Sequence, residues 1–206
     1  MSTGAIRVVG TRSFAAEVVD FAEDVGYVVV APLEPFERER VGATIHGKPV
    51  AWLDEAEPGP VVIGTGERSR REIVERAAAA GMTFVTVVHA RAHVSARSAV
   101  GEGVVIGPGA VVGAYSTLGQ HVVVGRGALV GHHTEIGDYV TLNPGANVAG
   151  NVQIGADAFV GMAAVVRDHL RVGAGSTVAM GAVVMKDVPA GRTVRGLPAR
   201  LVDRAE

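Results

Sequence analysis

The chain has 206 residues, of which 48% are hydrophobic and 28 are glycine, so it can form one large domain or two small ones. Its 19 basic and 21 acidic side chains give a net charge of -2, which is unlike that of proteins that bind nucleic acid or anionic membranes. The absence of cysteine excludes disulfides, thiolate metal sites and a covalent cysteine mechanism. No stretch approaches the roughly 20 apolar residues of a membrane span, and we expect a cytoplasmic protein.

Residues 6–88 alternate short apolar runs with stretches of helical periodicity. This pattern predicts a small Rossmann-like β/α domain over residues 1–88. The expected strands cover residues 6–9, 27–30, 61–63 and 84–88, and the expected helices cover residues 13–25 and 68–80.

Two glycine-containing turns follow expected strands of this domain. The first places Ser13 where it would cap the following helix, whose free backbone N–H groups bind phosphates or carboxylates. Open α/β sheets bind ligands at the carboxyl ends of their strands. The candidate substrate-binding residues are therefore those of the two turns: Gly10, Arg12, Ser13, Phe14, Gly64 and Arg68. The complete GxGxxG fingerprint is absent, and the alternative is that the turns only join strand to helix.

A different period begins at Val94 and continues to Val184. Every sixth residue is aliphatic, sixteen times in succession, and glycine follows ten of them. Hexads of this kind form a parallel β-helix. Three short strands then make a coil of 18 residues, about five coils follow, and residues 18 apart stack at about 4.8 Å.

This stacking assigns the side chains to an inside and an outside. We expect the repeated aliphatic residue and the residue four places later, such as Ala110 or Ala128, to point inward. Three outward columns result: Val105, Val123, Thr141, Phe159 and Thr177; Val111, Leu129, Asn147, Val165 and Val183; and Ala99, Thr117, Glu135, Gln153 and Arg171. Two columns are largely apolar, which favours a homotrimer because two different apolar faces suit a closed ring. The alternative is that the N-terminal domain covers one of them.

The corners of the β-helix hold the candidates for chemistry. His132 is expected at a corner beside a groove between subunits, with Gly150 one coil above it leaving space next to the imidazole. His133 would stack between its column neighbours as either a second functional residue or a structural corner residue. Met162 and Met180 would stack at the next corner, where they either contact a thioether-bearing chain or fill a gap.

These features together resemble a known family. The hexads are accompanied by G-H-H-T-E-I-G-D over residues 131–138, N-P-G-A over 143–146 and A-G-N-V over 149–152. The stretch V-R-G-L-P-A-R over residues 194–200 is similar to the V-x-G-x-P-A-K/R tail of the left-handed β-helix acyltransferases, and H-A-R-A over 89–92 resembles their domain-joining segment. Within that superfamily the chain resembles the NeuD/PglD-like sugar O- and N-acyltransferases, over nearly its whole length.

The resemblance implies a left-handed parallel β-helix over residues 89–206 and an acyltransferase. It implies that His132 is the general base, that acetyl-CoA lies between subunits and that the N-terminal domain holds a nucleotide-linked amino sugar. An imidazole can take the proton of the attacking amine or hydroxyl near neutral pH, and the Gly150 N–H would stabilise the oxyanion. We expect direct transfer, because no cysteine can carry the acyl group.

The chain departs from the family pattern at two places. The family usually has Asp or Glu after the catalytic histidine, whereas this chain has His133, and Glu135 and Asp138 do not occupy that position. Arg12 stands where a glycine is common, and the expected second strand ends without the usual acidic pair. Arg12 or Arg68 would then contact an acidic group of the acceptor.

Three other functions are compatible with the same fold. The transfer could be to a sugar oxygen or to an amine that is not part of a sugar. A zinc enzyme of the β-helix type needs three histidines around one ion, but His121 lies on a different corner from His133 and His169, so we expect no metal. A trimeric binding module without catalysis is the third alternative.

Overall fold

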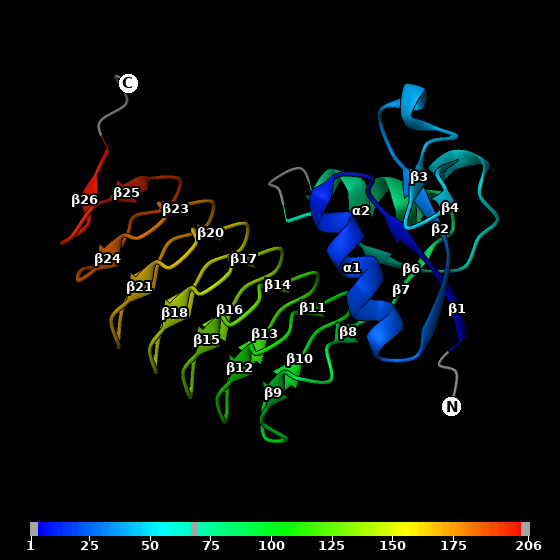
Figure 1. Cartoon of the computed structure of the whole chain (residues 1–206). Coiled ribbons are helices and arrows are strands. Elements are labelled where there is room, and N and C mark those ends of the chain that lie inside the picture. Colours follow the sequence, from blue (N-terminus) through cyan, green and yellow to red (C-terminus); the bar gives the residue numbers. More distant parts are fainter. Residues whose placement is uncertain (1–3, 67–69, 203–206) are drawn as a thin grey trace. The chain divides into compact units, whose positions relative to one another are not determined.

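The computed structural model describes residues 4–66 and 70–202, and the chain divides into two compact units, Met1–Ala90 and Arg91–Glu206. The first unit is an α/β domain and the second is a parallel β-helix (Figure 1). The fold class expected from the sequence is therefore confirmed. Within the described ranges, no helix has the length and apolar composition that crossing a membrane requires.

The α/β domain is built on a parallel sheet with the strand order β5-β2-β1-β6-β7. Its strands are β1 (Gly4–Val9), β2 (Tyr27–Glu34), β5 (Ala51–Trp52), β6 (Pro60–Ile63) and β7 (Thr83–Phe84). Helix α1 (Ser13–Asp24) follows β1, and α2 (Arg70–Ala79) follows β6. The central strands carry fully buried valines, and α1 buries one apolar face that includes Val18 and Val19. Burial of these aliphatic side chains holds the helix and the sheet together.

Strand β2 continues four residues beyond the expected end at Val30. Pro32 lies inside this extension, and a proline cannot donate a hydrogen bond to a neighbouring strand. The Leu33 carbonyl oxygen accepts a hydrogen bond from Gly10 N (2.8 Å), so the backbone polar groups of Pro32 face the opposite side of β2. On that side, β5 pairs with β2 only from Leu33 onward, so the N–H that Pro32 lacks is not needed for a hydrogen bond between the strands.

Two further expectations for this domain need correction. Ser13 is the first residue of α1 and not its cap, because Arg12 occupies the capping position in extended conformation and makes no side-chain capping bond. The expected strand over 84–88 is divided into β7 and β8 (Val87–Val88). Between β2 and β6 lie short elements that the periodicity did not indicate: a 3-10 turn (Arg38–Arg40), the hairpin β3 (Thr44–Ile45) and β4 (Lys48–Pro49), and a second 3-10 turn (Leu53–Glu55).

The β-helix has three faces of stacked two-residue strands (Figure 1). One face contains β10 (Ala99–Val100), β13 (Thr117–Leu118), β16 (Glu135–Ile136), β19 (Gln153–Ile154) and β22 (Arg171–Val172). The next contains β11 (Val105–Ile106), β14 (Val123–Val124), β17 (Thr141–Leu142), β20 (Phe159–Val160), β23 (Thr177–Val178), β25 (Thr193–Arg195) and the antiparallel β26 (Arg200–Leu201). The third contains β9 (His93–Val94), β12 (Val111–Val112), β15 (Leu129–Val130), β18 (Asn147–Val148), β21 (Val165–Val166) and β24 (Val183–Val184).

The register of these strands confirms the 18-residue stacking. Val111 pairs with Leu129, and Glu135 pairs with Gln153, one coil apart in each case. The repeated aliphatic residues from Ile106 to Val184 are buried, as are the small inward residues such as Ala110 and Ala128. The periodicity therefore identified the core of this unit correctly.

The outward columns differ in how exposed they are within the single chain. Val111, Leu129 and Val165 are 37–39% exposed, as expected for an uncovered apolar face. In contrast, Val105 and Val123 are only 1% and 4% exposed within the single chain. The two apolar columns therefore differ: the first is buried at these two positions, and the second is exposed. The column from Ala99 to Arg171 is exposed and polar.

Stacking of the coils requires glycine where backbones approach closely, and this predicts the effect of one substitution. In Gly155→Ala, the added Cβ would lie 2.5 Å from the backbone N of Ala174 and 2.8 Å from its Cα. A backbone neighbour cannot move aside without disturbing the ladder, so we expect the free energy of unfolding to fall by about 1–3 kcal/mol, measured by chemical denaturation. The control is Gly127→Asn, where nothing lies within 4 Å and asparagine tolerates the positive φ of 61°. Equal losses in the two variants would contradict this explanation.

Candidate active site

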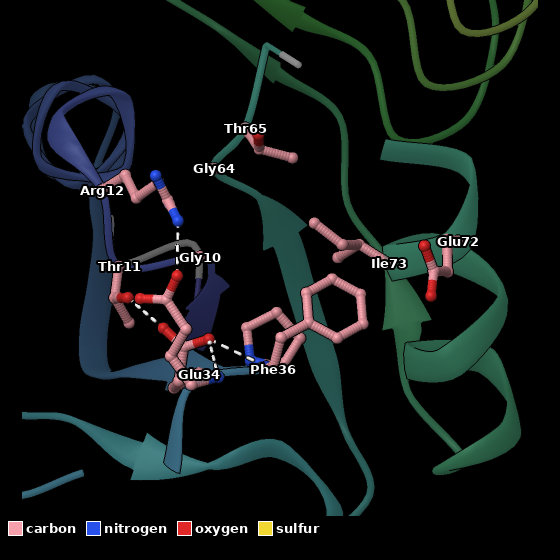
Figure 2. A pocket seen from close by; sticks show the side chains of 11 residues that line it. Gly10, Thr11, Arg12, Glu34, Phe36, Gly64, Thr65, Glu72 and Ile73 are labelled. Carbon is pink, nitrogen blue, oxygen red and sulfur yellow. Dashed lines mark hydrogen bonds and ion pairs between the residues drawn. The ribbon is translucent and has the colours of Figure 1, made fainter. Parts of the chain in front are cut away.

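The α/β domain contains a cavity of about 290 Å³ at the carboxyl ends of its central strands (Figure 2). The chain leaves β1 toward β2 on one side and later returns to the other side as β6, so strand order reverses beside β1. Ligands of open α/β sheets bind at such a point. The cavity is lined by Gly10, Thr11, Arg12, Glu34, Pro35, Phe36, Glu37, Gly64, Thr65, Glu72 and Ile73.

Two glycines allow the ends of β1 and β6 to approach each other at this cavity. A Cβ on Gly10 would lie 3.0 Å from the Gly64 carbonyl oxygen, and Gly10 has a φ of 124°. A Cβ on Gly64 would lie 2.6 Å from the Val8 side chain and 3.0 Å from Ala15. Both positions therefore require glycine for close packing, which was the alternative to a ligand-binding role, although both also line the cavity.

Glu34 is a buried acidic residue at the end of β2 that the sequence analysis missed. Its side chain is 4% exposed and accepts hydrogen bonds from the Thr11 hydroxyl and from the backbone N–H groups of Phe36 (2.8 Å) and Glu37 (2.9 Å). Both carboxylate oxygens are thus used to hold the loop after β2 against the turn after β1. Glu34 shapes one wall of the cavity.

An ion pair forms part of the lining of the cavity. Arg12 pairs with Glu37, which also pairs with Arg40 (Figure 2 shows the Arg12 contact). The hydrogen bond from Arg40, and then that from Arg12, hold the pKa of the Glu37 carboxyl below its usual range. The Arg12 side chain is 63% exposed. An exposed pair of this kind is weak, and so Arg12 can exchange Glu37 for an anionic ligand group.

The cavity brings together three of the six residues expected to bind substrate. Gly10, Arg12 and Gly64 line it, whereas Ser13 and Phe14, at the start of α1, do not. Arg68 lies outside the described residues.

The second candidate site is a corner of the β-helix between β15 and β16, where His132 and His133 are adjacent and exposed. The His132 imidazole lies over Gly150 of the next coil: a Cβ on Gly150 would be 2.8 Å from His132 Cε1 and 2.9 Å from Nε2. The ring occupies the space that a side chain at position 150 would fill. Glycine at this position therefore lets the imidazole contact the backbone of the following coil.

A buried threonine fixes the peptide group that contains the Gly150 nitrogen. The Thr134 hydroxyl donates to the Ala149 carbonyl oxygen (3.1 Å), and the side chain is fully buried. Carbonyl and N–H point in opposite directions in a trans peptide, so this bond directs the Gly150 N–H away from the core. Among the residues that the structure describes, this N–H has no acceptor.

Thr134 is the last member of a ladder of inward-pointing hydroxyl groups, of which Ser116 and Thr134 are buried and Ser98 is half-buried. Its N–H donates to the Ser116 hydroxyl (3.1 Å), which in turn donates to the Gly131 carbonyl oxygen (2.7 Å). Ser98 makes the same two bonds one coil earlier, to Gly113 O and from Ser116 N. The ladder therefore anchors the peptide groups that precede both His132 and Gly150.

The other candidates at the corners remain separate from this pair. Met162 and Met180 are 48% and 70% exposed and occupy one corner column, so both side chains are accessible. In the described part of the chain, no three His, Asp or Glu side chains gather in a way that could hold a metal ion.

Comparisons with known proteins identify relatives of the whole chain. No protein-family model and no curated protein sequence matches it. Among solved structures, the acetyltransferase domain of PglB from Neisseria gonorrhoeae, in complex with acetyl coenzyme A, is 32% identical, with a TM-score of 0.87, over 96% of this chain and 98% of that one. A histidine-to-asparagine mutant of perosamine N-acetyltransferase from Caulobacter crescentus, in complex with CoA and GDP-perosamine, is 26% identical, with a TM-score of 0.91, over 98% of each chain.

A third structure, WeeI from Acinetobacter baumannii, is 29% identical, with a TM-score of 0.88, over 97% of this chain and all of that one. These likenesses extend over both the α/β domain and the β-helix, and one of them exceeds 30% identity. The family suggested by the hexads and the H-H-T-E motif is thereby confirmed: the chain belongs to the NeuD/PglD-like sugar acyltransferases.

Proposed function

We propose that this acyltransferase transfers the acetyl group of acetyl-CoA directly to the amino group of a nucleotide-linked amino sugar, with His132 as general base. The observation that carries the proposal is the contact of the His132 imidazole with Gly150 at a corner of the β-helix. That contact places a base beside a backbone N–H that has no acceptor among the described residues. Transfer to a sugar hydroxyl would use the same groups.

The proposed reaction forms a carbon–nitrogen bond and breaks the carbon–sulfur bond of the thioester, with one proton transferred by His132. The amine nitrogen attacks the thioester carbonyl carbon, and His132 Nε2 takes the proton that the nitrogen loses. When the tetrahedral intermediate collapses, the carbon–sulfur bond breaks and the CoA sulfur leaves, taking the proton that His132 had accepted, so that the imidazole is neutral again. Base catalysis of this type contributes about 100- to 10,000-fold.

The Gly150 N–H is suited to stabilise the charge that develops on the carbonyl oxygen. A donor fixed before the reaction needs no reorganisation, and one such donor contributes about 3 kcal/mol in well-ordered sites. Thr134 supplies this order through the Ala149 carbonyl, because it is buried and its hydroxyl makes the bond at 3.1 Å.

We assign the donor to the β-helix and the acceptor to the α/β domain. The exposed thioethers of Met162 and Met180 are apolar and adaptable, as a surface for the pantetheine arm should be. The open apolar face with Val111, Leu129 and Val165 is suited to pack against a second copy of the chain in a homotrimer. The cavity lined by Gly10, Arg12 and Gly64 would hold the nucleotide-linked sugar, with Arg12 on a phosphate.

The base assignment predicts the effect of His132→Ala. We expect kcat to fall about 100- to 10,000-fold, because the attacking amine loses its proton acceptor. The assay follows release of the CoA thiol and identifies the acetylated product by mass. The control is His169→Ala, which removes another exposed histidine from the neighbouring corner column. A wild-type rate in the His132 variant would show that the base is another group.

The oxyanion assignment predicts a smaller effect for Thr134→Val, which keeps the buried shape and removes the hydroxyl. We expect kcat to fall about 10-fold, or 1.4 kcal/mol, because the peptide of Gly150 is less well fixed. The KM values should change little. Ser98→Ala loses the same kind of bonds two coils earlier and should keep wild-type kinetics. If both variants lose kcat equally, the hydroxyl ladder only stabilises the fold.

The acceptor assignment predicts the effect of Arg12→Ala. A charge-assisted hydrogen bond contributes about 1.5–3 kcal/mol, so the KM for the nucleotide-linked amino sugar should rise about 10- to 100-fold. The KM for acetyl-CoA should stay the same. Arg38→Ala is the control, because Arg38 pairs with Glu55 and does not line the cavity. Acetylation of free amines alone, in a screen that also offers nucleotide-linked amino sugars, would refute this assignment.

A further inference from the structure

His133 contacts the proposed base through one specific atom. His133 Nδ1 lies 3.1 Å from His132 Nδ1, and the two rings are nearly perpendicular, at 85° with centroids 5.2 Å apart. The backbone of His133 is left-handed, with a φ of 54°.

The chemistry of imidazole limits how the two rings can share this contact. A hydrogen bond between two Nδ1 atoms needs one donor and one acceptor, so only one of the two atoms carries a proton. If His132 is to accept a proton at Nε2, its own proton must be on Nδ1. His133 must then be neutral, with a bare Nδ1 that accepts and a proton on Nε2.

We propose that His133 is a positioning residue that fixes the tautomer of His132 by accepting its Nδ1–H, in the place where a carboxylate would otherwise stand. This inference rests on the proposed role of His132 as general base. His133 holds the imidazole ring with its Nε2 free, and it continues to accept when His132 becomes an imidazolium during the reaction. Unlike a carboxylate, it adds no negative charge beside the imidazole of His132.

Among the residues that the structure describes, the other charged and aromatic groups near the pair have contacts of their own. Tyr115, on the preceding coil, stacks on His133 with ring centroids 5.0 Å apart, and Asn151 occupies the same corner one coil later. Asp168 and His169 lie two coils after the pair and contact each other. Glu135, on the same coil, accepts a hydrogen bond from Gln153 on the exposed polar face.

Three substitutions at position 133 separate acceptance of the hydrogen bond from titration of the ring. In His133→Asn, the amide oxygen stands at the same distance from the backbone as Nδ1, and asparagine tolerates the left-handed conformation that Asn151 adopts in the same column. We expect this variant to keep kcat within about 3-fold of the wild-type value. His133→Leu removes the acceptor, and we expect kcat to fall at least 10-fold with both KM values unchanged.

His133→Asp adds the missing charge and gives a readout that a purely structural role would not move. A carboxylate beside the His132 imidazole favours its protonated form. Since only neutral His132 accepts a proton, the acid limb of the kcat/KM profile should shift to higher pH, by about one pH unit or more. His169→Leu is the matched control for backbone strain, because His169 has a φ of 57° in the same column.

Nitrogen NMR of the wild-type protein, with ¹⁵N-labelled histidine, tests the tautomers directly and needs no variant to fold. We expect the neutral pair in opposite forms: His132 protonated at Nδ1 and His133 at Nε2. The same tautomer in both rings, full kcat in His133→Leu, or an unshifted acid limb in His133→Asp would overturn the inference. If His132→Ala keeps the wild-type rate, the proposed function fails. If only the results at position 133 disagree, the role of His133 alone fails.

Discussion

The backbone hydrogen bonds between successive coils are the interaction on which the rest of this structure depends. Each coil bonds to the one before and the one after it, as Gly131 N does to Val148 O (2.8 Å). These bonds keep residues 18 apart in register along all three faces. A side chain at one corner therefore has a fixed neighbour in the next coil.

This constraint explains why the proposed catalytic groups come from two coils. His132 and Gly150 are 18 residues apart, so the backbone hydrogen bonds between successive coils bring the imidazole over the glycine without any loop. Thr134 and Ser116 add side-chain hydrogen bonds inside the β-helix next to this corner. A site held by backbone ladders on both sides has little freedom to rearrange, and such rigidity is what base catalysis and oxyanion stabilisation need.

The periodicity of the sequence was sufficient to predict the β-helix, its core and its corner columns, because one repeat determines all three. It was not sufficient for the α/β domain beyond its main strands. The last part of β2, which contains Pro32 and ends at Glu34, was not predicted from the sequence. Whether a strand can contain a proline depends on where the neighbouring strand begins to pair, and the sequence does not report this. The pairing of Arg12 with Glu37 joins residues 25 apart across an irregular loop, and no period reports it.

Other features of the site were present in the sequence and could have been found. Ser98, Ser116 and Thr134 occupy three successive inward positions of one column where aliphatic or small residues are the rule. Hydroxyl groups stacked inside the apolar β-helix need hydrogen-bond partners, because burying an unpaired hydroxyl costs free energy of folding. The 18-residue register predicts that these partners are backbone carbonyls at the adjoining corner. Two of them, those of Gly131 and Ala149, directly precede His132 and Gly150.

The two units also differ in how firmly their functional groups are held, and this bears on specificity. Backbone hydrogen bonds between coils and the buried Thr134 hydroxyl fix the corner with His132. In contrast, part of the cavity lining is the solvent-accessible ion pair between Arg12 and Glu37. Exposed pairs contribute little to stability, so Arg12 and Glu37 can be replaced at small cost to the fold. The groups proposed to bind the acceptor can therefore vary without disturbing those proposed to transfer the proton.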